Sequence, residues 1–212
     1  MLITFEGIEG SGKSTQVELL NDYLLSKGHT VVRTREPGGS LFGEALRKVL
    51  LQRDMNIFPL SELLVFMAMR AQHVEQVILP ALQERKIVLC DRFVDATYAY
   101  QGAARGLNLE FIKAINDYSS MGLKPNLTLL FDLPVEIGLQ RATERDNRLK
   151  DSSFSDRFER ESLNFHNKVR AGYLNILKSE PERFRLIDAA RDVDTIQKEV
   201  QRHITEFIGQ LD

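Results

Sequence analysis

Residues 5–15, with the sequence FEGIEGSGKST, decide the fold of this chain. They contain the pattern G-x-x-x-x-G-K-[ST], with Gly7, Gly12, Lys13 and Ser14 at its fixed positions. The apolar run LITF precedes the pattern and suits a buried strand, and the segment TQVELLNDYLLSK after it has apolar residues at helical spacing. A strand, a glycine-rich turn and a helix form the context in which this pattern holds phosphate.

Each part of the loop has a physical role in binding a phosphate chain. Glycines let the backbone curl closely around an anion, so that successive amides and the positive end of the new helix point at it. Lys13 is expected to reach the outer phosphates, and the hydroxyl of Ser14 to bind Mg²⁺. The sequence therefore predicts a nucleoside triphosphate site made of Gly7, Ile8, Glu9, Gly10, Ser11, Gly12, Lys13, Ser14 and Thr15.

Length and composition bound the class of protein. The 212 residues suit one domain over residues 1–212, and 28 basic against 30 acidic residues give a net charge of −2. Such a chain has no long-range positive field for nucleic acid, and no uncharged apolar stretch approaches the roughly 18 residues of a membrane span. The N-terminus has no signal-peptide pattern, and the single cysteine, Cys90, cannot form an internal disulfide. We expect a cytoplasmic protein with neither nucleic acid nor membrane as a partner.

Apolar runs alternate with helical patterns along the chain. Four runs after the first strand are predicted to be strands: HTVVRT, KIVLCD, NLTLLFD and RLID. A long apolar helix is expected over about 61–85, with Ser61 as its N-cap and an interruption at Pro80. Strands that alternate with helices predict an α/β domain with a five-stranded parallel sheet, covered by helices on both faces.

Charged residues follow two of these strands, at the edge of an open α/β sheet where ligands bind. Asp91 follows the third strand and is expected to hold Mg²⁺ together with Ser14, while Arg92 enters the same crevice. Arg35 and Glu36 follow the second strand, where a solvated charge pair on a turn is the alternative interpretation.

Two further segments have the side chains to read a nucleobase. Phe66 and Arg70 are four residues apart and share a helix face. Phe66 alone is more typical of a core, but a buried arginine usually needs an anion or acceptor. The segment 95–106 carries rings, a hydroxyl and an amide, including Thr97, Tyr100 and Gln101. Aromatic residues packed inward at a helix start remain the alternative for that segment.

Residues 141–160 differ in character, with six basic and five acidic residues but few apolar ones. This composition favours a mobile lid that closes over phosphates and supplies arginines to developing charge. A solvated charged loop is the other interpretation. The four histidines are scattered and predict no zinc site.

Four blocks in this order resemble thymidylate kinases of the bacterial type: FEGIEGSGKST, TREPGG, DRF with TYAYQG downstream, and DRFE after the basic segment. The resemblance spans essentially the whole chain. It implies the phosphate-loop NTPase fold of nucleoside monophosphate kinases, usually as a homodimer. It also implies Mg²⁺-dependent transfer of the γ-phosphoryl group of ATP to dTMP, giving dTDP for dTTP synthesis and DNA replication.

The same resemblance implies individual roles. Phe66 would stack on thymine, and Arg70 and Gln101 would bind its edge. Arg92 would grip the dTMP phosphate, and Arg141 would stack on adenine. The complete set at dTMP is Glu9, Glu36, Arg47, Phe66, Arg70, Arg92, Thr97, Tyr100 and Gln101.

The resemblance also concerns the catalytic cations. Some members carry an arginine in the loop, where this chain has Glu9. The cations are then expected in the lid, where Arg145 and Arg148 are candidates besides Lys13 and Arg92, and Arg148 is favoured.

Two other functions compete with this interpretation. A kinase of the same fold could act on another nucleotide or on a deoxynucleoside, and the latter needs a carboxylate base beside the 5′-hydroxyl, for which Glu36 or Glu9 could serve. A GTP switch usually needs an N-K-x-D element. The nearest stretch, residues 167–170, ends in arginine instead.

Overall fold

A computed structural model describes residues 1–52, 55–149 and 157–209, apart from the side chains of Arg148 and Leu149. Its centre is a parallel sheet with the strand order β2-β3-β1-β4-β5, which confirms the predicted sheet. The strands are β1 Leu2–Glu6, β2 Val31–Arg35, β3 Ile87–Asp91, β4 Leu127–Asp132 and β5 Phe184–Asp188.

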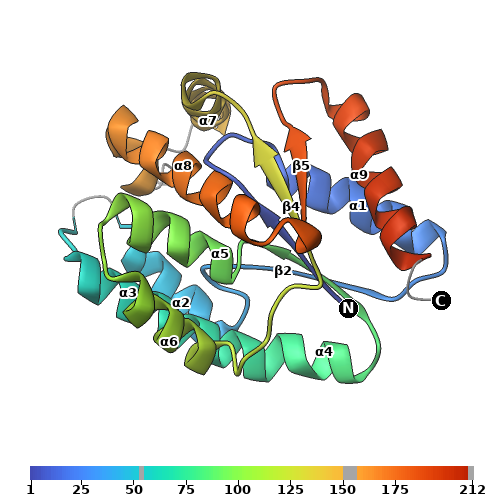
Figure 1. Cartoon of the computed structure of the whole chain (residues 1–212), viewed down its shortest axis with the longest axis horizontal. Coiled ribbons are helices and arrows are strands. Elements are labelled where there is room, and N and C mark those ends of the chain that lie inside the picture. The colour runs from blue at the N-terminus through green and yellow to red at the C-terminus, as the bar shows by residue number, and fades with distance from the viewer. Residues whose placement is uncertain (53–54, 150–156, 210–212) are drawn as a thin grey trace.

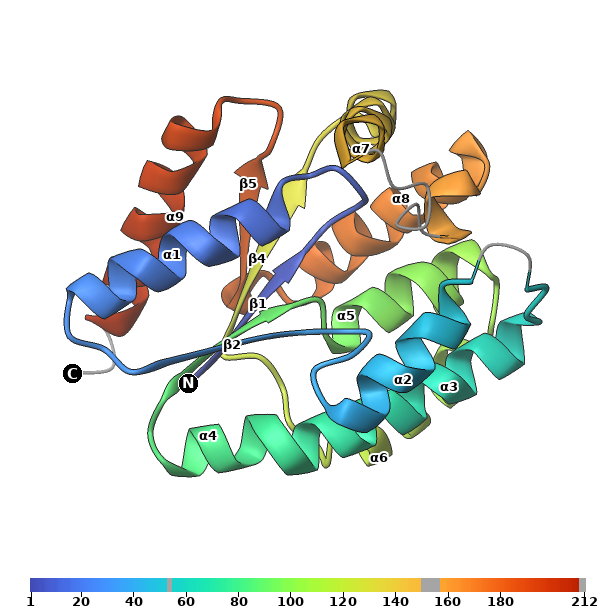
Figure 2. The same ribbon diagram turned by 180° about the vertical axis from the view of Figure 1, so that it is seen from behind.

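Helices cover both faces of this sheet. Figures 1 and 2 show α1 and α9 on one face, and α5 and α8 on the other. The α-helices are α1 Lys13–Ser26, α2 Leu41–Leu50, α3 Pro59–His73, α4 Leu79–Gln83, α5 Val94–Thr97, α6 Leu109–Ser119, α7 Val135–Leu149, α8 Leu163–Ser179 and α9 Val193–Ile208. The π-helical segments are η1 Val74–Ile78 and η2 Tyr98–Ala104, and the 3₁₀ segments are η4 Arg157–Arg160 and η5 Pro181–Arg183.

The apolar strand sequences follow from the position of each strand in the sheet. Every residue of β1 is buried, because β1 lies in the middle of the sheet with helices on both sides. Phe5 on β1 stacks on Phe131 of the neighbouring β4, with 5.9 Å between ring centroids. The edge strand β2 is only partly buried and carries arginines. The central strands therefore form a rigid base for the loops that follow them.

One of two predicted details of the long apolar helix needs correction. The first long helix after residue 55 begins at Pro59, where proline fits the first helical position, so Ser61 is not its N-cap. The expected interruption at Pro80 is confirmed, because the π-helical segment η1 ends at Ile78 and a new helix, α4, begins with Pro80 in its first turn. Among the described residues, no helix combines the length and apolar character needed to cross a membrane.

The strand register brings the functional loops together. Phe5 on β1 and Arg35 on β2 both pair with Asp91 on β3, so the three strands end at the same level. The glycine-rich loop, the turn at Glu36 and the turn after Asp91 therefore meet at one edge of the sheet, as expected for an open α/β fold.

Candidate active site

A cavity of about 540 Å³ opens at this edge of the sheet. Gly7, Ile8 and Ser11 do not line it, and the side chain of Arg148 lies outside the described residues. The other predicted site residues line this single cavity: Glu9, Gly10, Gly12, Lys13, Ser14, Thr15, Glu36, Arg47, Phe66, Arg70, Asp91, Arg92, Thr97, Tyr100, Gln101, Arg141 and Arg145.

The loop needs its glycines for steric reasons. A Cβ at Gly7 would lie 2.4 Å from the carbonyl oxygen of Phe131, and one at Gly10 would lie 1.9 Å from that of Gly138. Both glycines also have positive φ, as does Gly12 immediately before α1. The loop therefore packs directly against the backbone of β4 and of α7.

Lys13 is held by acceptors of the loop itself. Its Nζ donates to the carbonyl oxygen of Ile8 at 2.8 Å and to Oγ of Ser11 at 3.1 Å. Burial, followed by the positive charge of Arg92, lowers the pKa of Lys13 to about 8, although Asp91 and Glu9 act in the opposite direction. A bound phosphate would place a negative charge beside this buried ammonium group.

Ser14 and Asp91 meet across the loop and the end of β3. Oγ of Ser14 donates to Oδ2 of Asp91 at 2.6 Å, and both residues line the cavity. A hydroxyl and a carboxylate are hard oxygen ligands of the kind that Mg²⁺ takes. Within the described residues there is no group of three or more His, Cys, Asp or Glu side chains that could hold a metal. The pair therefore fits an ion that takes its other ligands from water and phosphate.

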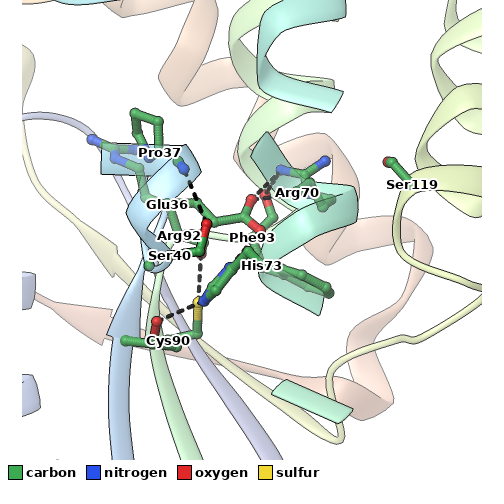
Figure 3. Close-up of polar contacts among 12 residues, drawn as sticks. Glu36, Pro37, Ser40, Arg70, His73, Cys90, Arg92, Phe93 and Ser119 are labelled. Atoms are coloured by element: carbon green, nitrogen blue, oxygen red, sulfur yellow. Dashed lines mark hydrogen bonds and ion pairs between the residues drawn. The ribbon is translucent and has the colours of Figure 1, made fainter. Parts of the chain in front are cut away.

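Arg92 connects the turn after β3 to the loop. Its guanidinium donates to the carbonyl oxygen of Gly7 at 2.8 Å and to Oε1 of Glu9 at 3.0 Å. It also lies 4.8 Å from the ring centroid of Tyr100. The backbone φ of Arg92 is 69°, a left-handed conformation that side chains seldom adopt. Sγ of Cys90 donates to the Arg92 carbonyl oxygen at 3.0 Å, which helps hold the turn (Figure 3).

Glu9 is buried inside the loop and carries its charge there. Its Oε1 accepts from the hydroxyl of Tyr100 at 2.6 Å, and its Oε2 lies 3.2 Å from Nδ1 of His166. Burial alone would raise the pKa of Glu9, but Arg92 and His166 outweigh burial and hold the pKa well below its ordinary value. A carboxylate this acidic accepts a proton poorly, which counts against Glu9 as a general base.

Glu36 is the second acidic residue proposed as a base, and it is also saturated. Arg70, only 1% exposed, donates from Nε to Oε2 of Glu36 at 2.8 Å, while Nδ1 of His73 lies 3.1 Å from Oε1. Figure 3 shows Arg70 and His73 converging on Glu36 from α3. Burial raises the pKa of Glu36, but Arg70 and His73 together lower it further than burial raises it.

The burial of Glu36 excludes the alternative interpretation that Arg35 and Glu36 form a solvated charge pair on a turn. Glu36 is 6% exposed and pairs with Arg70, whereas Arg35 lines the same cavity and pairs with Glu44 at 3.0 Å. The two neighbours are therefore not a solvated charge pair.

The remaining bonds of Arg70 fix it between three elements. It donates to the carbonyl oxygen of Phe93 at 3.0 Å and to Oγ1 of Thr97 at 2.9 Å, and it also bonds Oδ1 of Asn116. The sequence prediction missed His73 and Asn116, which lie on helices with no motif around them. The signal that could have found them is the presence of polar residues on otherwise apolar helix faces.

The aromatic wall of the cavity comes from separate segments. The ring of Phe66 on α3 lies 6.2 Å from that of Phe158, and Tyr100 meets Phe158 edge-on at 5.7 Å. Phe158 lines the cavity but was not predicted from the sequence. Phe66 is partly buried and faces this space, so it is not simply a core residue.

The predicted lid has regular structure on both sides of residues 150–156, which lie outside the described residues. Helix α7 continues to Leu149, and η4 begins at Arg157. Arg141 donates to the carbonyl oxygens of Ala189 and Ala190 at 2.7 and 3.2 Å. Arg145 pairs with Glu159 at 2.5 Å, so this cation is held at the rim of the cavity.

Comparison with known proteins assigns the chain to a family. The family model described as thymidylate kinase matches residues 5–200. The chain belongs to the thymidylate kinase family. A thymidylate kinase from Syntrophus aciditrophicus is 50% identical over 203 residues, covering 95% of this chain and 93% of that relative. One from Desulfovibrio desulfuricans is 48% identical and covers 98% and 96%. A crystal structure of thymidylate kinase from Ehrlichia chaffeensis has a TM-score of 0.77 at 36% identity, with 97% and 98% of the chains covered.

Behind the cavity of this thymidylate kinase family member lies a buried acid, Glu6. Its Oε1 accepts from the backbone N–H of Phe93 at 2.7 Å, and its Oε2 from the hydroxyl of Tyr173 at 2.7 Å. Burial, then the charge of Asp95, raises the pKa of Glu6 to about 8. The folded chain therefore keeps a proton on Glu6 at a pH where the unfolded chain releases it.

We expect this proton to make stability depend on pH. The contribution of Glu6 is complete below its ordinary pKa of 4.5 and is lost as pH rises toward 8, with a slope of up to about 1.4 kcal/mol per pH unit. Urea unfolding at pH 5, 6, 7 and 8 measures the slope. Glu6→Gln keeps the shape but cannot ionise, so its stability should fall less over this range. Parallel profiles for the two proteins would contradict the assignment.

Proposed function

We propose that the chain transfers the γ-phosphoryl group of ATP to dTMP, giving dTDP and ADP, with Mg²⁺ bound beside the phosphate loop. The observation that carries the proposal is one cavity lined both by the phosphate loop and by Phe66, Arg70 and Gln101. Membership of the thymidylate kinase family identifies the reaction.

The donor nucleotide occupies the loop end of the cavity. Lys13 and the loop amides bind the phosphates of ATP, and Arg141 at the start of the lid lies against adenine. Ser14 and Asp91 hold Mg²⁺, which neutralises negative charge on the phosphate oxygens when it is bound. Their direct hydrogen bond of 2.6 Å supports this assignment, because it places both oxygens at one point of the cavity.

The acceptor nucleotide occupies the opposite wall. Phe66 stacks on thymine, Arg70 and Gln101 bind its edge with Thr97 nearby, and Tyr100 lies beside the deoxyribose. The phosphate of dTMP is bound by Arg92, Arg47 and Glu36, the last through water or metal. Arg92 supports this arrangement, because it lies between Glu9 of the loop and the ring of Tyr100.

The chemistry requires that the two nucleotides are positioned and that the negative charge on their phosphates is neutralised; it does not require a general base. The accepting phosphate oxygen of dTMP is already anionic, so no group has to remove a proton from it. A deoxynucleoside kinase would need a carboxylate able to take up a proton, and the pKa values of Glu9 and Glu36 are both lowered. These shifts favour a nucleotide acceptor over a nucleoside.

Closure of the lid, residues 141–160, completes the site in this proposal. Arg145 and Arg148 supply positive charge to the transferred group, and closure excludes water that would hydrolyse ATP. Burial raises the pKa of Glu159 to about 7, and its partner Arg145 opposes that rise. A carboxyl group with a raised pKa carries less negative charge near neutral pH and binds a cation less strongly. A phosphate group therefore competes with Glu159 for Arg145.

We also propose a homodimer in the cytoplasm. Helices α2, α3 and α6 lie side by side (Figure 2) and expose large apolar residues. An apolar surface shared by several helices favours association with a second copy. The exposed residues are Leu41, Phe42, Val49, Leu60, Leu64, Leu109, Phe111 and Tyr118.

A coupled assay of ADP release tests the function. The acceptors are dTMP, dUMP, UMP, dCMP, dGMP and thymidine, each with ATP in the presence and absence of Mg²⁺. We expect strong turnover with dTMP, weaker turnover with dUMP, negligible turnover with thymidine, and none without Mg²⁺. Turnover with thymidine but not dTMP would assign the chain to the nucleoside kinases. Release of ADP at the same rate with and without an acceptor would support only the assignment of the phosphate loop.

A further inference from the structure

Glu62 is a fully buried carboxylate behind the wall that we assign to the base. It lies in the first part of α3 and has no exposed surface. Its Oε1 accepts from Nε2 of Gln101 at 2.9 Å and from Nε of Arg105 at 3.2 Å. Its Oε2 accepts from Arg105 at 3.2 Å and from Arg157 at 2.6 Å.

We propose that Glu62 is a positioning residue that turns the side-chain amide of Gln101 so that its oxygen faces the cavity and selects a pyrimidine with a hydrogen on N3. This inference rests on the proposed function. It adds the reason why the site selects one pyrimidine base of the acceptor nucleotide over another.

The orientation of the Gln101 amide follows from the chemistry of its partner. A carboxylate paired with two guanidinium groups offers only acceptor oxygens, so the group that meets it must be the amide nitrogen of Gln101. Glu62 itself is held by donors from η4 and from Arg105 after η2, and Arg105 bonds Glu161 in turn at 2.6 Å. The carboxylate therefore has little freedom to rotate.

The oxygen of the same amide remains available to a ligand. Gln101 lines the cavity, and within the described part of the chain its Oε1 accepts no hydrogen bond. It is also not among the buried polar atoms without a partner. Gln101 thus presents one acceptor to the cavity, while its amide nitrogen donates to Glu62.

This acceptor distinguishes the pyrimidines. Thymine and uracil carry a donor at N3 and an acceptor at O4, whereas cytosine has an acceptor at N3 and a donor at N4. The oxygen of Gln101 therefore matches the N3 donor of thymine and uracil and opposes the N3 acceptor of cytosine, and a buried polar group left without a partner disfavours a ligand strongly.

Glu62→Gln tests the proposal because it should invert the amide. Oε2 accepts from two arginines, whereas Oε1 accepts from one arginine and from Gln101, whose amide can turn, so the new amide oxygen should take the Oε2 position. Its nitrogen would then face Gln101, which must turn its own oxygen toward residue 62 and its nitrogen toward the cavity. We expect kcat/KM for dTMP to fall at least about 10-fold, mainly through KM, while that for dCMP rises.

Glu161→Gln is the matched control, since it removes a carboxylate from the same arginine without touching Gln101. It should leave the ratio of dTMP to dCMP activity unchanged. Equal losses with both substrates in Glu62→Gln would overturn the inference and leave Glu62 a purely structural role. Failure of the unmodified chain to use dTMP would instead overturn the proposed function, so the two failures are distinguishable.

A second measurement uses the unmodified chain and does not depend on the folding of a variant. The side-chain amide of Gln101 is observed by NMR after ¹⁵N-glutamine labelling and assigned with Gln101→Leu. The proton that bonds to Glu62 should already exchange slowly with solvent before nucleotide is added. If both protons exchanged fast and became protected only when dTMP binds, the amide nitrogen would face the base, and the proposal would be overturned.

Discussion

Lys13→Ala is expected to lower the turnover of dTMP by about 10³-fold or more, the range seen when one charged or hydrogen-bonding group is removed from a developing transition state. The side chain lies inside the loop, and its burial means that a bound phosphate chain would meet an ammonium group shielded from water. A steady-state assay with saturating ATP, Mg²⁺ and dTMP measures the loss.

Two controls separate this loss from damage to the fold. Lys27→Ala removes a cation at the opposite end of α1, where Lys27 lies over the ring of Tyr23, and should leave turnover unchanged. Binding of dTMP to Lys13→Ala, measured by calorimetry, should be preserved, since Lys13 is assigned to ATP. Normal turnover in Lys13→Ala would refute the assignment of the phosphate loop.

Arg70→Ala is expected to have the second largest effect, on both binding and stability. The KM for dTMP should rise about 100-fold, because the lost guanidinium leaves the thymine edge unpaired. The free energy of unfolding should fall by about 3–5 kcal/mol, because Glu36 remains buried with its charge and loses its main partner. Kinetics with varied dTMP and urea unfolding measure the two effects.

A double variant distinguishes the two roles of Arg70. Adding Glu36→Gln to Arg70→Ala removes the unpaired charge, so stability should partly recover while the KM for dTMP stays high. If only the KM for ATP rose in Arg70→Ala, the location of the base pocket would be wrong.

The parts of the fold that could be predicted from the sequence are those with a local signal. The phosphate loop is a contiguous motif whose glycines lie against the backbone of β4 and α7. The central strands are continuous apolar runs because both faces of the sheet are covered. The parallel register then places Asp91 beside the loop without any further information.

Helix faces were predicted less well, because a single residue changes the direction of a side chain by about 100°. In α1, the apolar residues at helical spacing include Val17, Leu20 and Leu24, which are buried, and Leu25, which is 51% exposed. In α2, Leu41 belongs to the apolar spacing and is 88% exposed. Spacing identifies an apolar face of α2 but not whether that face meets the core or a second chain.

Residues behind the cavity could not be predicted from the sequence. Glu62 and His73 lie on the apolar helix α3, and their partners are 37 to 95 residues away along the chain. Charged residues on a helix usually face solvent, so nothing local indicates burial. Only the packing of α3 against η2 and η4 shows that Glu62 supports Gln101.

The turn after β3 has a consequence for the spacing of the two nucleotides. Asp91 accepts from Ser14 of the phosphate loop, Arg92 donates to Gly7 of the same loop, and the carbonyl of Phe93 accepts from Arg70, which we assign to the base. Three consecutive residues span only about 7 Å, and covalent bonds fix that length. In the proposed arrangement, bond geometry at one short turn therefore sets the distance between the two nucleotides, and mutations that shift the outer helices should leave the alignment of the reacting phosphates intact.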